Sequence, residues 1–229
     1  MESYGVFDAG LQEVRLLSRQ DSTRSGLGGD EALASAIQRS VCVLLVSHFE
    51  GFLKELAEEM VEQLIEAEPT MRQLPQALRE LHSLPRLEEI ARCSNDQQRH
   101  NLLKRLGDVA VFWSPDARVD NKRLSASTVS RTVTSAQPEV IDTLFSTFGS
   151  GNAVCDGDID VADPNGGDPA PVNIRTRLQE IVKCRNDIAH GIAERKVTYA
   201  DVDRYVAFLD ALAKRFCAKA DITVFQLTT

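Results

Sequence analysis

A chain of 229 residues in which 43% are apolar and 26% are charged has the composition of a globular protein that can bury a sizeable core. Its net charge of −8 argues against indiscriminate binding of nucleic acid, which normally requires a basic surface. No stretch approaches the roughly 18 uninterrupted apolar residues of a membrane span, and the first residues lack the basic start and apolar segment of a signal peptide. We therefore expect a cytoplasmic protein without a membrane segment.

The five cysteines are odd in number, scattered and never arranged as a C-x-x-C pair. This pattern predicts free thiols in a reducing compartment and no zinc site. His82 and His100 have no partner at metal-binding spacing, so we expect no metal and no cofactor, whereas His48 on an apolar helix face is expected to be a core residue.

Residues 1–30 are predicted to be a weakly structured N-terminal segment with a short helix near Leu11–Leu17. Glycine and serine are frequent between Ser22 and Gly29, and Asp30 is a plausible N-cap for the helix that follows.

The strongest helical signal runs from Glu31 to about Glu68, where Pro69 ends it. The apolar residues recur at steps of three and four: Leu33, Ile37, Val41, Leu44, Leu45, Phe49, Phe52, Leu56, Met60 and Leu64. Gly51 lies inside this helix, which suggests that another helix approaches closely there.

The middle of the chain is predicted to hold shorter helices split by Pro75 and Pro85, with a better helix from about Gln97 to Val111. Trp113 is interpreted as a packing residue. We expect an insertion over residues of roughly 112–172 that forms a loop or a small β region. Within it, Pro138 is expected to begin a helix that ends near Phe148.

Two further helices are predicted near the C-terminus. Asn173 caps the first, and Gly191 is placed to end it as the C′ residue. Thr198 and Asp201 form a capping box for the second, which reaches about Ala218. The fold class is therefore all-α, with a single domain over 31–220 in which the long early helix pairs with the last two, and a β-prone tail over 221–229.

The segment Arg185-Asn186-Asp187-Ile188-Ala189-His190-Gly191 carries the chemistry that suggests a function. Arginine is a fixed fork of donors that fits phosphate oxygens, and histidine can move a proton near neutral pH. Between residues 173 and 196 there are six cations and three acids, which is either a nucleic-acid-binding surface or ordinary solvated charge.

The motif from Leu178 to Gly191 resembles the Arg-x(4–6)-His signature of HEPN domains, which are helical domains of many bacterial ribonucleases and toxin–antitoxin or defence modules. The run from Leu44 to Lys54 is similar to the early helix of the RiboL-PSP-type branch of that superfamily. The similarity covers about 31–68 and 173–217.

This resemblance implies a metal-independent endoribonuclease that works as a homodimer on RNA, as a toxin or antiphage defence effector with an antitoxin or other defence-module protein as partner. Arg185 would hold the scissile phosphate, His190 would act as general base or acid for attack by the 2′-hydroxyl, and Asn186 would orient the imidazole or the substrate. Lys183, Asp187 and Glu50 would have secondary roles in substrate binding.

Two alternatives remain open at this stage. The first is a non-catalytic HEPN module that binds RNA, a nucleotide or a protein partner. The second gives the motif a structural role only, in which Arg185 pairs with Glu180 or Asp187, His190 caps its own helix, and Glu50 binds backbone or Arg185.

Overall fold

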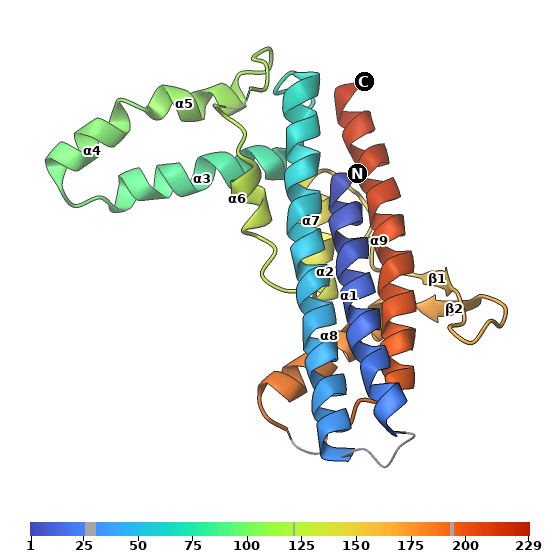
Figure 1. Cartoon of the computed structure of the whole chain (residues 1–229). Helices are drawn as coiled ribbons and strands as arrows, with labels where there is room; N and C mark the ends of the chain where they lie inside the picture. The colour runs from blue at the N-terminus through green and yellow to red at the C-terminus, as the bar shows by residue number, and fades with distance from the viewer. Residues whose placement is uncertain (26–30, 121, 193–194) are drawn as a thin grey trace.

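The computed structural model describes residues 1–25, 31–120, 122–192 and 195–229. Three long helices, α1 (Glu2–Ser25), α2 (Glu31–Ala67) and α9 (Tyr199–Thr228), run side by side, and α8 (Ile174–Ala189) packs against α2 (Figure 1). This arrangement confirms the predicted all-α bundle, including the pairing of the long early helix with the last two helices.

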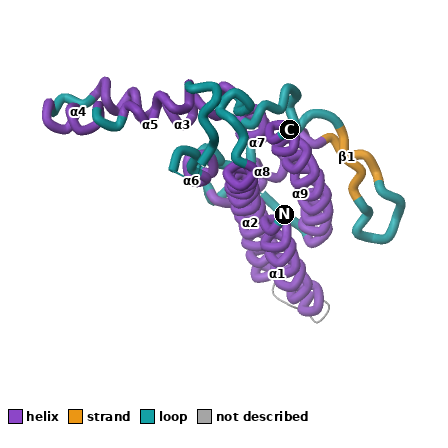
Figure 2. The backbone as a smooth tube through the Cα atoms, turned by 90° about the horizontal axis from the view of Figure 1, so that it is seen from above, coloured by secondary structure: helices purple, strands orange, loops and turns teal. Residues whose placement is uncertain are grey.

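The chain between α2 and α8 forms two projections from the bundle (Figure 2). The first is an arm made of α3 (Gln76–Arg92), α4 (Asp96–Leu103) and α5 (Leu106–Ala110), which leads through a 3-10 turn (Val111–Trp113) to α6 (Ala126–Ser130) and α7 (Pro138–Thr147). The second is an antiparallel hairpin of β1 (Asp158–Val161) and β2 (Ala170–Asn173), in which Asp158 pairs with Asn173.

The core is built around α2, because its apolar residues recur at helical spacing and meet neighbours on several sides. Phe7 of α1 lies with its ring 5.6 Å from that of Phe49 and 5.2 Å from that of Phe52, measured between centroids. Leu33, in the first turn of α2, is the exception to the predicted stripe, since it is 45% exposed. Helix α2 has the length and hydropathy of a membrane span, and its buried side chains from Val41 to Leu64 form the centre of this bundle.

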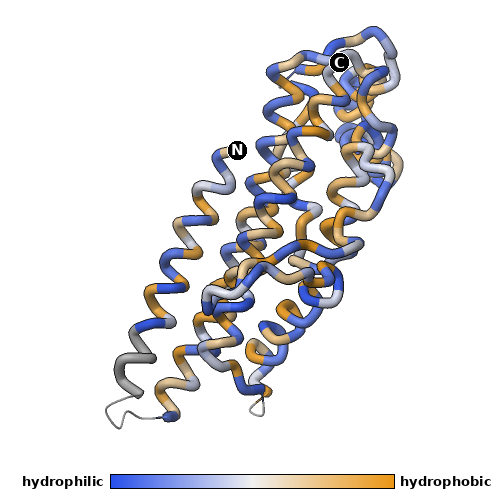
Figure 3. Tube along the Cα trace, turned by 90° about the vertical axis from the view of Figure 1, so that its right-hand side faces the viewer, coloured by the Kyte–Doolittle hydropathy of each residue, from blue (hydrophilic) through white to orange (hydrophobic). Residues whose placement is uncertain are grey.

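The short helix expected near Leu11–Leu17 is present but much longer, since residues 2–25 form α1, so the expectation of a weakly structured segment is wrong for the rest of these residues. Phe7, Leu11 and Val14 are buried at steps of three and four, and hydrophobic and hydrophilic bands alternate along this helix (Figure 3). The Glu59 carboxylate of α2 accepts hydrogen bonds from the Ser3 backbone N–H and hydroxyl, so packing and a cap from another helix stabilise α1. The predicted N-cap at Asp30 lies outside the described residues.

The predicted β-prone tail over 221–229 is also wrong, because α9 continues to Thr228. Phe216, Ala220 and Val224 are buried at steps of four residues, and Thr223, three residues after Ala220, is buried as well. The helix therefore keeps one apolar face against the bundle, and this packing overrides the β propensity of the tail.

A loop or a small β region was predicted for the insertion. The last part of the insertion does contain a small β region, formed by β1 and β2. Between residues 114 and 135, also within the predicted loop or β region, the structure has the short helix α6. Pro75 precedes α3 as expected, whereas Pro85 lies inside that helix without splitting it. The helix predicted over 97–111 is divided into α4 and α5 around Lys104.

The close helix approach expected at Gly51 is absent, since a Cβ built there would meet nothing within 4 Å. The close approach lies at Gly10 of α1, where a Cβ would be 2.7 Å from the ring of His48. The glycine that permits tight contact between α1 and α2 is therefore on α1.

Candidate active site at the end of α8

Local sequence signals fix both ends of α8. The Asn173 side chain accepts a hydrogen bond from the Thr176 backbone N–H at 3.1 Å, and Gly191 adopts a φ of +75°, as a C′ residue requires. The Gly191 N–H bonds the Ile188 carbonyl at 3.0 Å, and the Ile192 N–H bonds the Asp187 carbonyl at 2.9 Å. Both predicted caps are confirmed, and the helix ends at the residue that was singled out for chemistry.

Arg185 points from α8 towards α2. Its Nη2 donates to Glu50 Oε2 at 3.1 Å, and its Nη1 donates to Asn186 Oδ1 at 3.0 Å. The Arg185 side chain is 30% exposed and that of Glu50 is 18% exposed. The guanidinium is therefore held by a carboxylate and an amide and still reaches solvent.

Glu50 also contacts the segment before α7, because its Oε1 accepts a hydrogen bond from the Ala136 backbone N–H at 3.4 Å. One carboxylate thus joins α2, the end of α8 and the start of α7. The structural alternative in which Arg185 pairs with Glu180 is wrong, since Glu180 bonds Arg177 at 2.8 Å and Tyr205 at 3.0 Å.

His190 is the C-cap of α8 and is exposed, and its backbone N–H bonds the Asn186 carbonyl at 2.9 Å. At 3.6 residues per turn, five positions along a helix correspond to a rotation of about 140°. Arg185 and His190 therefore leave the same helix in different directions, the first towards α2 and the second towards solvent. The Asn186 side chain contacts the guanidinium.

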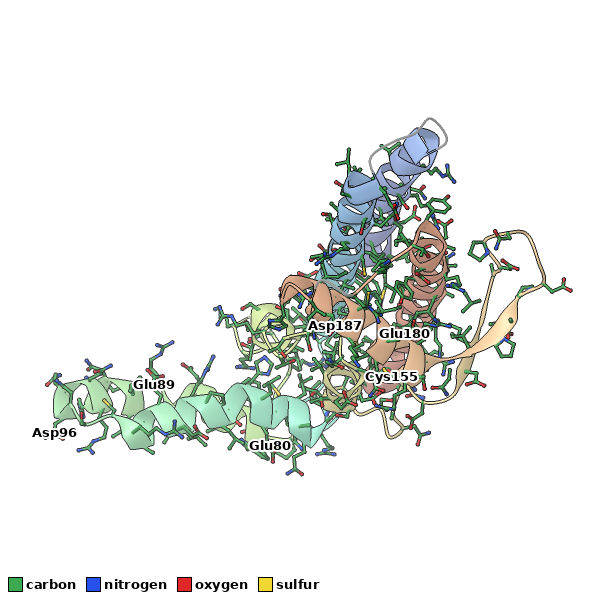
Figure 4. The ribbon with its side chains drawn as sticks, turned by 90° about the horizontal axis from the view of Figure 1, so that it is seen from below. Glu80, Glu89, Asp96, Cys155, Glu180 and Asp187 are labelled. Carbon is green, nitrogen blue, oxygen red and sulfur yellow. The ribbon has the colours of Figure 1, made fainter. Side chains whose placement is uncertain are left out.

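Lys183 and Asp187 lie with His190 along one stripe of α8, at positions four and three residues apart. Lys183 is exposed and Asp187 is half-buried, and Figure 4 shows Asp187 in the last turn of the helix with Glu180 further back. The structure thus brings Arg185, Asn186 and Glu50 together, and it places Lys183 and His190 on an exposed face beside them.

A family model described as RiboL-PSP-HEPN matches residues 10–220. The chain belongs to this family. The match includes most of α1 and the whole insertion, so it extends well beyond the two segments that carry the sequence resemblance. No curated protein and no solved structure matches the chain.

Two other histidines of this HEPN domain, His48 and His82, have structural contacts. His48 Nε2 lies 3.2 Å from Glu13 and packs on Gly10 at the α1–α2 contact, with a side chain that is 28% exposed. His82 is buried, and its ring nitrogens contact Leu78 O at 2.9 Å and the Ser125 backbone N–H at 3.1 Å. Burial lowers the pKa of His82, which favours the neutral ring.

Trp113, which was predicted to be a packing residue, is 45% exposed, and the Arg79 guanidinium lies over its ring, 5.0 Å from the centroid. All five cysteines are free, as predicted. Sequence reasoning missed that Cys42 of α2 lies 3.7 Å from Cys184 of α8, between the two sulfur atoms. No local pattern could reveal this pair, since 142 positions separate its members.

Proposed function

We propose that this HEPN domain is an endoribonuclease that cleaves RNA phosphodiesters without a metal ion, and that it acts in the cytoplasm as a toxin or antiphage defence effector. The observation that carries the proposal is the half-exposed Arg185 guanidinium, oriented by Glu50 and Asn186 at the end of the helix that presents His190. Membership of the RiboL-PSP-HEPN family supports it.

Arg185 is suited to holding the scissile phosphate. Arginine has five N–H donors, of which two bond Glu50 and Asn186 in the described part of the chain, which leaves up to three for phosphate oxygens. Because Glu50 and Asn186 already fix the direction of the guanidinium, its N–H groups can stabilise the charge that develops on the phosphate. The arginine side chain does not have to move during the reaction. Glu50 is thus a positioning residue, which sets the direction of the guanidinium and offsets part of its charge.

His190 would transfer the proton. As a base it would accept the proton of the ribose 2′-hydroxyl during attack on the adjacent phosphorus, and as an acid it would donate to the leaving 5′-oxygen. The product would carry a 2′,3′-cyclic phosphate.

The divergence of Arg185 and His190 on one helix favours a composite site in a homodimer. If two α8 ends face each other, the guanidinium of one protomer lies opposite the imidazole of its partner. Lys183 and Asp187, on the same face as His190, would then line the cleft, where the Lys183 ammonium would contact the RNA phosphates.

The central test is a cleavage assay with the intact chain, with and without a chelator. We expect Arg185→Ala and His190→Ala to abolish cleavage, whereas Arg177→Ala, on the same helix, and His100→Ala, exposed on α4, retain it. An RNA with a 2′-deoxy nucleotide 5′ of the cut should resist the enzyme. Cleavage that persists in that RNA would contradict attack by the 2′-hydroxyl.

A mixed dimer tests the composite site directly. Combining an Arg185→Ala chain with a His190→Ala chain leaves one intact pair, Arg185 from one protomer and His190 from the other. We expect this mixture to recover part of the activity that each variant alone has lost. A mixture as inactive as its components would exclude a site shared between protomers.

A second candidate function is a HEPN module that binds RNA, a nucleotide or a protein such as an antitoxin, without catalysis. Within this candidate, the ion pair between Arg185 and Glu50 and the net charge of −8 favour a protein partner, because both reduce the attraction of the site for a polyanion. A wild-type protein that binds RNA and leaves it intact under all these conditions would support this function and exclude the nuclease.

A further inference from the structure

A second contact joins the two helices that carry the candidate site. Cys42 of α2 donates a hydrogen bond from its thiol to the sulfur of Cys184 of α8, over 3.7 Å between the sulfur atoms. Both cysteines are free and fully buried. Cys184 immediately precedes Arg185, so this pair lies on the same helix-to-helix contact as the Glu50–Arg185 ion pair.

The surroundings make the two sulfur atoms chemically unequal. The hydrogen bond from Cys42 and the guanidinium of Arg195 lower the pKa of Cys184 to about 6, against burial and the charge of Asp187, which raise it. The same hydrogen bond, together with burial, raises the pKa of Cys42. Arg195 Nε is itself buried and has no hydrogen-bond partner in the described part of the chain.

We propose that Cys42 and Cys184 form a site of reversible oxidation, at which a hydroperoxide converts the two thiols into a disulfide between α2 and α8. The sulfur of Cys184 takes one oxygen of hydrogen peroxide, the O–O bond breaks, and the other oxygen leaves as water. The sulfur of Cys42 then attacks the sulfenic acid on Cys184, and the S–O bond breaks with loss of a second water. Two thiols and one hydrogen peroxide thus give one disulfide and two waters.

The geometry requires little movement for this reaction. The sulfur atoms must approach from 3.7 Å to about 2.0 Å, and they belong to neighbouring helices that already pack together. Burial selects a small oxidant, which local opening admits, over bulky thiol reagents. The end of α8 beyond Cys184 is the place for such opening, because residues 185–188 are half-buried and residues 189–190 are exposed.

The disulfide would cross-link positions 142 residues apart and fix α8 against α2 one residue before Arg185. A cross-link over so long a loop restricts the unfolded chain strongly, so the oxidised protein should melt several degrees higher than the reduced protein. This inference does not depend on the nuclease proposal, because it concerns a covalent change that is measured on the protein itself.

The experiment treats the full native chain with hydrogen peroxide and measures intact mass and peptide maps without reductant. We expect a loss of two hydrogens that maps to the Cys42–Cys184 pair and is reversed by dithiothreitol. Cys155→Ala, a matched change at another buried cysteine, should form the same link. A wild-type chain that keeps both thiols, gains oxygen at Cys184 without a link, or links other cysteines would overturn the proposal.

A second experiment tests which of the two thiols reacts first with hydrogen peroxide. In Cys42→Ala the sulfenic acid on Cys184 has no partner and should accumulate, where dimedone traps it. In Cys184→Ala, dimedone should label Cys42 far more slowly. Equal labelling of the two variants would overturn the assignment of Cys184 as the attacking thiol. N-ethylmaleimide applied to the native protein should label Cys93 and Cys217, which are half-buried, before the pair.

Discussion

Arg185 in the last turn of α8 donates a hydrogen bond over 3.1 Å to Glu50, a residue 135 positions earlier in the chain and near the middle of α2. The side chain that would grip a phosphate is therefore oriented by a different helix from the one that carries it. The position of the guanidinium depends on how α2 and α8 pack, so changes on α2 should alter chemistry at the end of α8.

Glu50→Ala tests this dependence. Removing the carboxylate leaves Arg185 free to rotate, and a misplacement of about 1 Å at a catalytic group can cost roughly 10²-fold in rate. We expect kcat/KM for RNA cleavage to fall to that extent, while the free energy of unfolding falls by about 1 kcal/mol, as is usual for a partly exposed ion pair. Glu50→Gln keeps one oxygen, which can accept from Arg185 while the amide NH2 replaces the oxygen that faces the Ala136 N–H, so it should retain more activity than Glu50→Ala. Equal activity in Glu50→Ala and wild type would contradict the positioning role.

Arg185→Lys should be nearly as damaging as Arg185→Ala. Lysine carries the charge on a single ammonium, which cannot bond Glu50 and Asn186 and also offer a planar fork to a phosphate. We expect kcat/KM to fall at least 10²-fold below the wild-type value in both variants. A separate titration with RNA measures how much of that loss comes from weaker binding. A lysine variant with full activity would show that Arg185 does not act as a bidentate ligand.

His82 should make the protein less stable in acid. Burial lowers its pKa in the folded state below its ordinary value of 6.5, so the unfolded chain binds the proton more tightly than the folded chain does. Its contribution to stability is therefore intact above about pH 6.5 and decreases as the pH falls below that value, by at most about 1.4 kcal/mol per pH unit for one proton.

Thermal melts of wild type and His82→Gln, recorded at and below about pH 6.5, measure the contribution of His82 to stability. The stability difference between the two proteins should shrink as the medium becomes more acidic. His100→Gln, at an exposed histidine of α4, serves as the control and should follow the wild type. A pH-independent difference would mean that His82 does not titrate on unfolding.

Gly10→Ala and Gly51→Ala should change stability in opposite directions. A Cβ at Gly10 would lie 2.7 Å from the His48 ring, so the ring and its contact with Glu13 must move, which should cost about 1–3 kcal/mol. A Cβ at Gly51 would meet nothing within 4 Å, and alanine is a better helix former than glycine, so Gly51→Ala should gain about 0.5–1 kcal/mol. Urea unfolding of the two variants measures both values, and destabilisation by Gly51→Ala would contradict the open space at that position.

The sequence by itself determined the elements whose signals are local. The periodicity of α2, the Asn173 and Thr198 caps, the positive φ of Gly191 and the motif ending at His190 depend on residues within a turn or two of one another. These features could be predicted because a helix and its ends are formed by interactions between near neighbours in the chain.

Only the tertiary structure decided which distant residues meet. In the packed bundle Arg185 pairs with Glu50 and not with Glu180, and Cys42 lies beside Cys184. The glycine at the close helix contact is Gly10, whereas the sequence had suggested Gly51. The tertiary structure also extended the short helix predicted near Leu11–Leu17 to residues 2–25, and it made a helix of residues 221–228, where local propensity favours a strand. The physical reason is that burying an apolar face against another helix outweighs weak local preferences, and that face is defined only once the helices have packed.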